Sequence, residues 1–227
     1  MRSTMCGGLA AVCGMAAAIG LADPARGISV TLTGVSPQST VSISSDAGAS
    51  FHSYLAGLDQ FQGVASNPLG LREGFVGFCV DFSQHISIGG TYTDYALTPL
   101  ENAGLPPMGA TAADHIEELW GRHFASLHTE TDYGAFQTSI WEILYDSDLS
   151  LSDGSFRMEA GSVRTLSQSW LDEIDGLGPK ATGLNALASP STQDMLVPTP
   201  GSAVLVVGGF AVGLTRRRRR AATGVKG

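Results

Sequence analysis

The chain has 227 residues with 13 basic and 21 acidic side chains, which gives a formal net charge of −8 at pH 7. All 21 acids but only six bases lie between residues 23 and 196, so this part alone carries a net charge of −15. Such a surface repels nucleic acid and anionic lipid, and it attracts basic or amine-bearing partners. About 174 residues are enough for one domain with a real core.

The first 22 residues have the pattern of an export signal. Its features are a basic Arg2, an apolar run over residues 5–21 and small residues at the predicted cleavage point after Ala22. Removal of this segment takes Cys6 and Cys13 away and leaves Cys79 as the only cysteine of the mature chain. Cysteines of exported proteins usually pair, so a single Cys79 indicates intermolecular pairing, a free thiol or another covalent use. The remaining alternative is a buried cysteine that acts as a small apolar core residue.

Alternating apolar residues predict strands in the first half of the mature chain. The pattern occurs over residues 28–32 and 41–44, with a break at Gly34 and Pro37, and residues 51–64 could hold one or two more strands. Residues 67–70 read as a turn. The apolar run over residues 75–82 predicts a buried strand that contains Cys79, and residues 91–97 predict another strand, followed by a loop over residues 100–109.

Helical spacing dominates the second half. Thr111 to Asp114 fits a capping box ahead of an apolar stripe that reaches residue 127. A second helix is predicted over residues 132–145, and a third begins with Ser162 as its cap and ends at Gly176. Residues 184–196 are expected to be a loop with one returning strand. The predicted fold is α+β: a β-sandwich or barrel-like antiparallel arrangement with a helical insert.

Two short segments stand out for chemistry. Phe78-Cys79-Val80-Asp81 lies in the predicted buried strand, and Phe136-Gln137-Thr138-Ser139-Ile140-Trp141 lies in the second predicted helix, 58 positions further on (137 minus 79). Together they resemble the paired motifs of the thioester domains of bacterial surface adhesins, over roughly residues 28–196. This sequence has Ser139 where that family usually has Ala, and Phe136 where it has Thr or Leu.

The resemblance implies an internal thioester between the Cys79 sulfur and the Gln137 side-chain carbonyl. Such a bond stores an acyl group that captures an amine or hydroxyl of a partner, as an isopeptide bond if the amine is a lysine. The family is one of covalent binding modules used once per molecule, not of enzymes. Asp81 and His85 are candidates for moving protons there, and the alternative for both is a solvated surface role. Trp141 and Tyr145 follow Gln137 on one helix face at i+4 and i+8, and are candidates to surround the bond.

Residues 197–220, at the C-terminal end, have the pattern of a second targeting signal. Pro198-Thr199-Pro200-Gly201 precedes an apolar stretch over residues 202–214 and a basic run that includes Arg216, Arg217 and Arg218. It resembles the PEP-CTERM sorting tail of Gram-negative bacteria, with Thr199 where that family has Glu. The resemblance implies retention in the membrane through a short transmembrane helix, processing by a sorting transpeptidase, and delivery to the cell surface or matrix. Residues 221–227 are expected to be disordered.

Other readings of the sequence predict less. His115, His123 and His128 do not share one helix face closely enough to predict a zinc site. The segment beginning Asp146-Ser147-Asp148 starts like a calcium loop but has Leu151 and Arg157 at the positions that need Gly and Glu, which leaves at most loose calcium binding. We therefore assign no metal and no cofactor. The alternative function is a structural protein of the envelope or exopolysaccharide matrix, with Cys79 inert.

Overall fold

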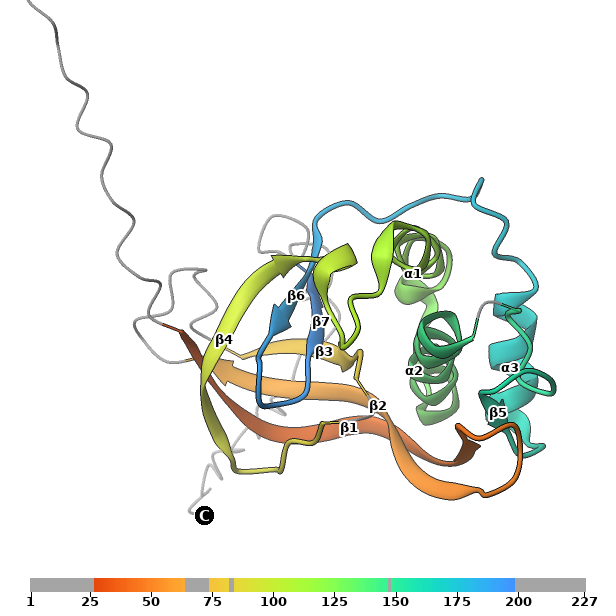
Figure 1. The fold of residues 1–227 in the computed structure, drawn as a ribbon, viewed down its shortest axis with the longest axis horizontal. Helices are drawn as coiled ribbons and strands as arrows, with labels where there is room; N and C mark the ends of the chain where they lie inside the picture. The colour runs from red at the N-terminus through yellow and green to blue at the C-terminus, as the bar shows by residue number, and fades with distance from the viewer. Residues whose placement is uncertain (1–26, 64–73, 82–83, 147, 199–227) are drawn as a thin grey trace, which may run out of the picture.

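The computed structural model describes residues 27–63, 74–81, 84–146 and 148–198 (Figure 1). The expected signal segment, the turn over residues 67–70 and the sorting tail from Thr199 onward lie outside these residues. The strands are β1 (Ile28–Ser44), β2 (His52–Gly63), β3 (Phe75–Cys79), β4 (Thr91–Pro99), β5 (Arg157–Met158), β6 (Leu184–Ala188) and β7 (Met195–Pro198). The main helices are α1 (Gly109–His123), α2 (Glu130–Tyr145) and α3 (Ser162–Leu171). The predicted α+β class is confirmed.

All strand pairs are antiparallel, and six of the seven strands close into a barrel-like ring. The order β2-β3-β7-β6-β4-β1 returns to its start because β1 also pairs with β2 along most of its length. Strand β5 extends the sheet beside the far end of β1. Figure 1 shows that β1 and β2 continue beyond the ring and run beneath the helices. The barrel and the helices therefore share one hydrophobic core.

Two predictions for the strands were wrong. The break expected at Gly34 and Pro37 is not a turn, because β1 runs through it with two register shifts. A bulge of this kind accommodates a proline, which has no N–H to give to the neighbouring strand. The segment expected to be a loop with one strand forms both β6 and β7, which pair with each other and close the ring.

Helix ends also differ from the prediction. Helix α1 begins at Gly109 and has no side-chain cap, so the predicted capping box at Thr111 does not form. The capping box belongs to α2, where Thr129 and Asp132 exchange side-chain and backbone hydrogen bonds. Helix α3 ends at Leu171 rather than at Gly176, and its N-cap is Gly161 rather than Ser162. Among the described residues, no helix is both long and apolar enough to span a bilayer.

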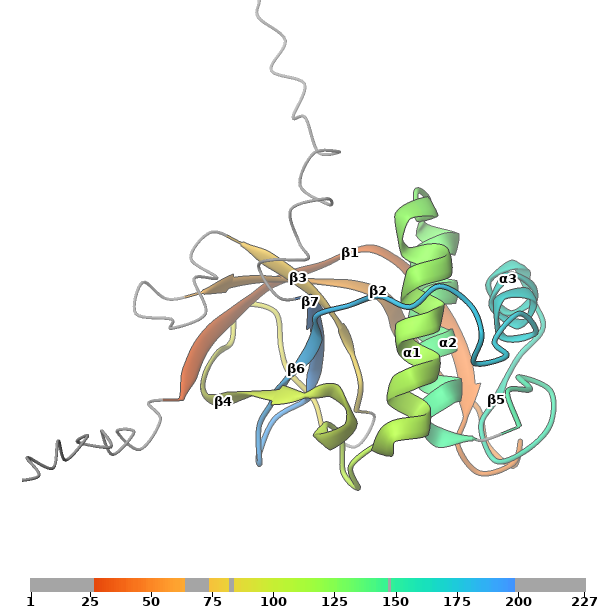
Figure 2. The same cartoon turned by 90° about the horizontal axis from the view of Figure 1, so that it is seen from above.

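Helix α2 is the centre of the helical layer. It contacts β1 and β2 on one side and lies between α1 and α3 on the other, as Figure 2 shows from above. Its Phe136 is fully buried, with ring centroids 4.9 Å from Phe78 of β3, 5.6 Å from Trp120 and 5.8 Å from Phe124. Aromatic packing of this kind contributes about 0.5–1.5 kcal/mol per pair beyond burial. The Phe78–Phe136 contact fixes α2 against β3.

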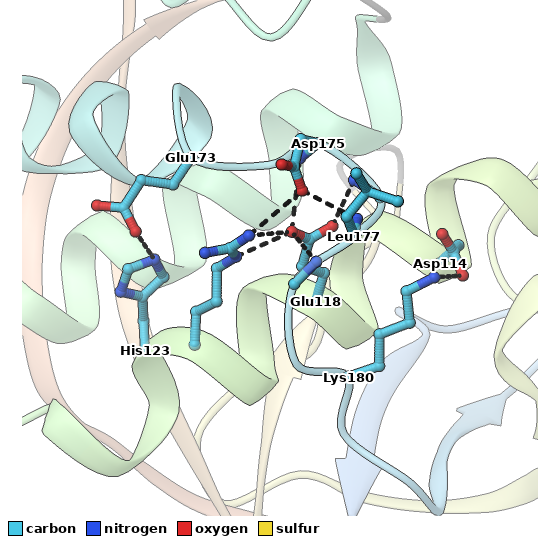
Figure 3. Close-up of polar contacts among 10 residues, drawn as sticks. Asp114, Glu118, His123, Glu173, Asp175, Leu177 and Lys180 are labelled. Carbon is cyan, nitrogen blue, oxygen red and sulfur yellow. Dashed lines mark hydrogen bonds and ion pairs between the residues drawn. The ribbon is translucent and has the colours of Figure 1, made fainter.

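A buried carboxylate ties the segment after α3 back to α1 (Figure 3). Glu118 is fully buried, pairs with Arg122 at 2.7 Å, and accepts hydrogen bonds from the backbone N–H groups of Gly176 and Gly178 at 2.7 and 3.0 Å. Burial raises its pKa, but these hydrogen bonds outweigh burial, so the pKa is lowered overall. The chain then leads into β6 with its path set by this anchor.

Candidate functional site

Cys79 and Gln137 are in direct contact. The backbone N–H of Cys79 donates to Gln137 Oε1 at 2.9 Å, and Gln137 Nε2 donates to the carbonyl of Cys79 at 2.8 Å. The contact follows from the packing, because Phe78 and Phe136 are the neighbours of these two residues in the chain and pack against each other with their rings tilted by 48°. Both residues are nearly inaccessible, with 5% of Cys79 and 1% of Gln137 exposed.

The Cys79 sulfur is surrounded by hydrogen-bonding groups. The thiol donates to the carbonyl of Asp81 at 3.0 Å, and the backbone N–H of Asp81 points at the sulfur from 3.4 Å. The side-chain amide of Gln193, from the segment between β6 and β7, also donates to the sulfur. The indole of Trp141 contacts the sulfur from α2. Donors of this kind stabilise the charged form of a thiol.

Burial nevertheless dominates the acidity of the thiol. It raises the pKa of Cys79 to about 12, and the negative charge of Asp59 adds to this, while the hydrogen bonds to the sulfur lower it. Burial also raises the pKa of Asp59, to about 7. A thiol in this state is protonated at neutral pH and needs a base. Asp59 lines the same cavity and has a pKa suited to accept that proton.

A cavity of about 470 Å³ opens over this pair of residues. Its polar lining includes Asp59, Cys79, Asp81, Gln137 and Gln193. Its apolar lining includes Leu32, Val35, Ile86, Leu55 and Ile88, of which the last two are strongly exposed at 53% and 63%. The cavity gives a small group access to a pair of residues that are otherwise covered.

The residues predicted to surround the pair have different positions. Asp81 is buried and bonds to the sulfur through its backbone, so a solvated surface role is wrong for it. Trp141 and the exposed His85 line the cavity. Tyr145 does not line it: the side chain is 37% exposed and stacks on Phe156 at the far end of α2.

A further expectation concerned the helix dipole. The helix predicted over residues 132–145 places Gln137 in its first turns, where the positive helix N-terminus would polarise the side-chain carbonyl. It is instead the eighth residue of α2, because the helix begins at Glu130. The dipole effect falls off within the first turn, so it does not reach Gln137. The N–H of Cys79 polarises this carbonyl instead, because it points directly at Gln137 Oε1.

Two residues of the site had no signal in the sequence motifs. Asp59 belongs to β2 and Gln193 to the link between β6 and β7. Only tertiary structure brings Gln193 to the sulfur and Asp59 to the cavity beside it. An acid at a core-facing strand position was the only available indication for Asp59.

Comparison with models of protein families, with characterised proteins and with solved structures finds no match for this chain.

Proposed function

We propose that this protein is a covalent binding module whose Cys79 and Gln137 form an internal thioester. The observation that carries the proposal is the pair of hydrogen bonds between the Gln137 carboxamide and the backbone of Cys79. They bring the acyl carbon beside the residue whose sulfur would attack it, from 58 positions away in the chain. Like the thioester domains that its motifs resemble, the protein is used once and is not a turnover enzyme.

Formation of the bond is an acyl transfer. Asp59 takes the thiol proton, the sulfur attacks the side-chain carbonyl carbon of Gln137, and the amide nitrogen leaves as ammonia after protonation. The N–H of Cys79 stabilises the negative oxygen that forms on the way, because it already points at Oε1 from 2.9 Å. The C–N bond is replaced by a C–S bond, and no oxidant or cofactor is consumed.

In the capture step the Cys79 sulfur is the leaving group, whereas in bond formation it is the nucleophile. A partner amine attacks the same carbon, the C–S bond breaks, and the sulfur leaves as a thiolate that takes up a proton. The backbone N–H of Asp81 and the amide of Gln193 stabilise the departing thiolate. Burial of both bonded residues keeps water from hydrolysing the stored bond before a partner arrives.

Charge and shape both bear on the partner. The mature part has six bases against 21 acids, and the cavity contains Asp59 and Asp81, so a cationic amine is attracted more than an anionic group. A hydroxyl on a neighbouring surface molecule is the second chemical class. The exposed Leu55 and Ile88 at the cavity offer an apolar contact to whichever chain carries the reacting group.

The location proposed for this module is the cell surface or the extracellular matrix. The signal over residues 1–22 would export the chain, and the tail over residues 197–220 would hold it in the membrane until a sorting transpeptidase processes it. The alternative, a structural matrix protein with an inert Cys79, would have the same export signal and sorting tail but no reactive thioester. Reactivity therefore distinguishes the two functions.

The test is reaction of the purified protein with methylamine. A thioester yields one methylamide on Gln137 and releases one titratable thiol on Cys79 in equal amounts. Cys79→Ala and Gln137→Glu are the matched controls, because each keeps the shape of the site and removes one bond partner. A wild-type protein that takes up no methylamine, and whose thiol is free from the start, would favour the structural alternative.

A further inference from the structure

A group of carboxylates at the C-terminal end of α2 is separate from the thioester pair. Glu142, Asp146 and Asp148 each present a carboxylate oxygen, and these oxygens lie within 4.8 Å of one another. Calcium binds carboxylate oxygens at about 2.3–2.6 Å, so two ligand oxygens on opposite sides of one ion lie about 4.6–5.2 Å apart. The three oxygens are spaced as ligands of a single ion.

The state of Glu142 is the independent observation that points to a ligand. Its side chain is 0% exposed, one oxygen accepts the N–H of Ser150 at 2.9 Å, and the other has no hydrogen-bond partner within the described part of the chain. A buried carboxylate oxygen without a partner is costly. Burial, reinforced by the charges of Asp146 and Asp148, raises the pKa of Glu142 to about 8.

Within the described residues, Glu142 and Asp148 form no ion pair. Arg157 donates instead to the carbonyl of Gly154 at 3.0 Å. The carboxylates also lie at the negative end of the α2 dipole, with Asp146 as the C-cap. Carboxylates are destabilising there and a cation is stabilising.

The loop that follows is built around the same carboxylates. Asp146 Oδ2 accepts hydrogen bonds from Ser155, and Asp148 Oδ1 accepts the N–H of Ser150 at 2.9 Å. At Gly154 a Cβ would collide with Asp146 and lie 2.7 Å from Asp148 Oδ2, and the φ of +71° is one that side chains rarely adopt. The glycine therefore leaves room in which the carboxylates meet.

We propose that Glu142, Asp146 and Asp148 bind a calcium ion that holds the end of α2 to the loop over residues 148–156. The ligand class is a hard divalent cation with oxygen ligands, and calcium is favoured over magnesium because the carboxylates come from a helix end and a turn rather than from a rigid octahedral cage. The site differs from an EF-hand, since its first ligand precedes the loop on the helix. It does not rest on the thioester.

The test is calcium binding by the purified protein, followed by calorimetry and by thermal unfolding after treatment with a chelator. We expect a dissociation constant on the order of 10⁻⁴ M, as in extracellular calcium modules. Calcium at about 1 mM should then raise the melting temperature by about 4 °C. Potassium chloride at equal ionic strength should not reproduce this rise.

Two variants make the test specific. Glu142→Gln keeps the shape of the buried side chain, and Asp148→Asn keeps the shape of an exposed one. Each should weaken calcium binding at least about tenfold. Glu159→Gln, an exposed acid outside the cluster, should bind like the wild type. Absence of calcium binding by the wild type would overturn the proposal, as would binding that both cluster variants retain. If the wild type binds no calcium, Glu142 and Asp148 share a proton instead.

Discussion

The buried Asp59 makes a quantitative prediction about stability. Its pKa is raised by burial from 3.8 to about 7, so the folded protein holds the proton more tightly than the unfolded chain does. The resulting stability is fully present below pH 3.8 and is lost as the pH rises through about 7. At about 1.36 kcal/mol per pH unit, the free energy of unfolding falls by about 4 kcal/mol over this interval.

Asp59→Asn removes this titration, so the variant should be more stable than the parent at pH 8 by up to about 4 kcal/mol, and the difference should vanish near pH 4. The measurement is urea unfolding across that pH range in a Cys79→Ala background, where no internal bond can form. Asp172→Asn, at an exposed aspartate, is the matched control. An Asp59→Asn variant with the same pH dependence as its parent would refute the reasoning.

With Cys79 present, Asp59→Asn should have the opposite effect on chemistry. Loss of a general base typically slows a reaction by about 10²–10⁴-fold, so the thioester should form far more slowly in the variant. Intact mass followed over time after refolding measures this rate. If the variant forms the bond as fast as the wild type, Asp59 is not the general base. That result would not argue against the thioester itself.

Three further substitutions test other parts of the structure. Glu118→Gln should lower the free energy of unfolding by about 2 kcal/mol in a urea titration, because the hydrogen bonds to this buried group lose their charge. Gly77→Ala should cost about 1–3 kcal/mol in the same assay, because its Cβ would lie 2.7 Å from the carbonyl oxygen of Leu196 on the paired strand. Gln193→Ala should slow methylamine-driven thiol release about tenfold, because the thiolate leaving from Cys79 loses a donor.

Periodicity in the sequence was sufficient for the elements that carry the two motifs. The buried strand around Cys79 and the helix around Gln137 both form, and Phe136, Ile140 and Ile143 of that helix are buried. Their neighbours Phe78 and Phe136 are large and apolar, which favours burial, but no sequence pattern predicts that the two rings pack against each other. The contact between Cys79 and Gln137 depends on that packing.

Local signals that fit two places were misassigned. A Thr followed three residues later by Asp occurs at Thr111 and again at Thr129, and only the second forms a capping box. The alanines after Gly109 favour helix strongly enough for α1 to begin before Thr111. Gln193 could not be predicted, since its position beside the sulfur depends on the pairing of β7 with β3.

The internal thioester is tested most directly by the intact mass of the protein purified without amines. We expect a main species lighter than its sequence by one ammonia, present in the wild type and in Asp172→Asn, and absent in Cys79→Ala and Gln137→Glu. Peptides around Cys79 and Gln137 should be recovered as one joined product. A wild-type protein of full sequence mass, whose Cys79 is alkylated freely once unfolded, would show that no thioester forms.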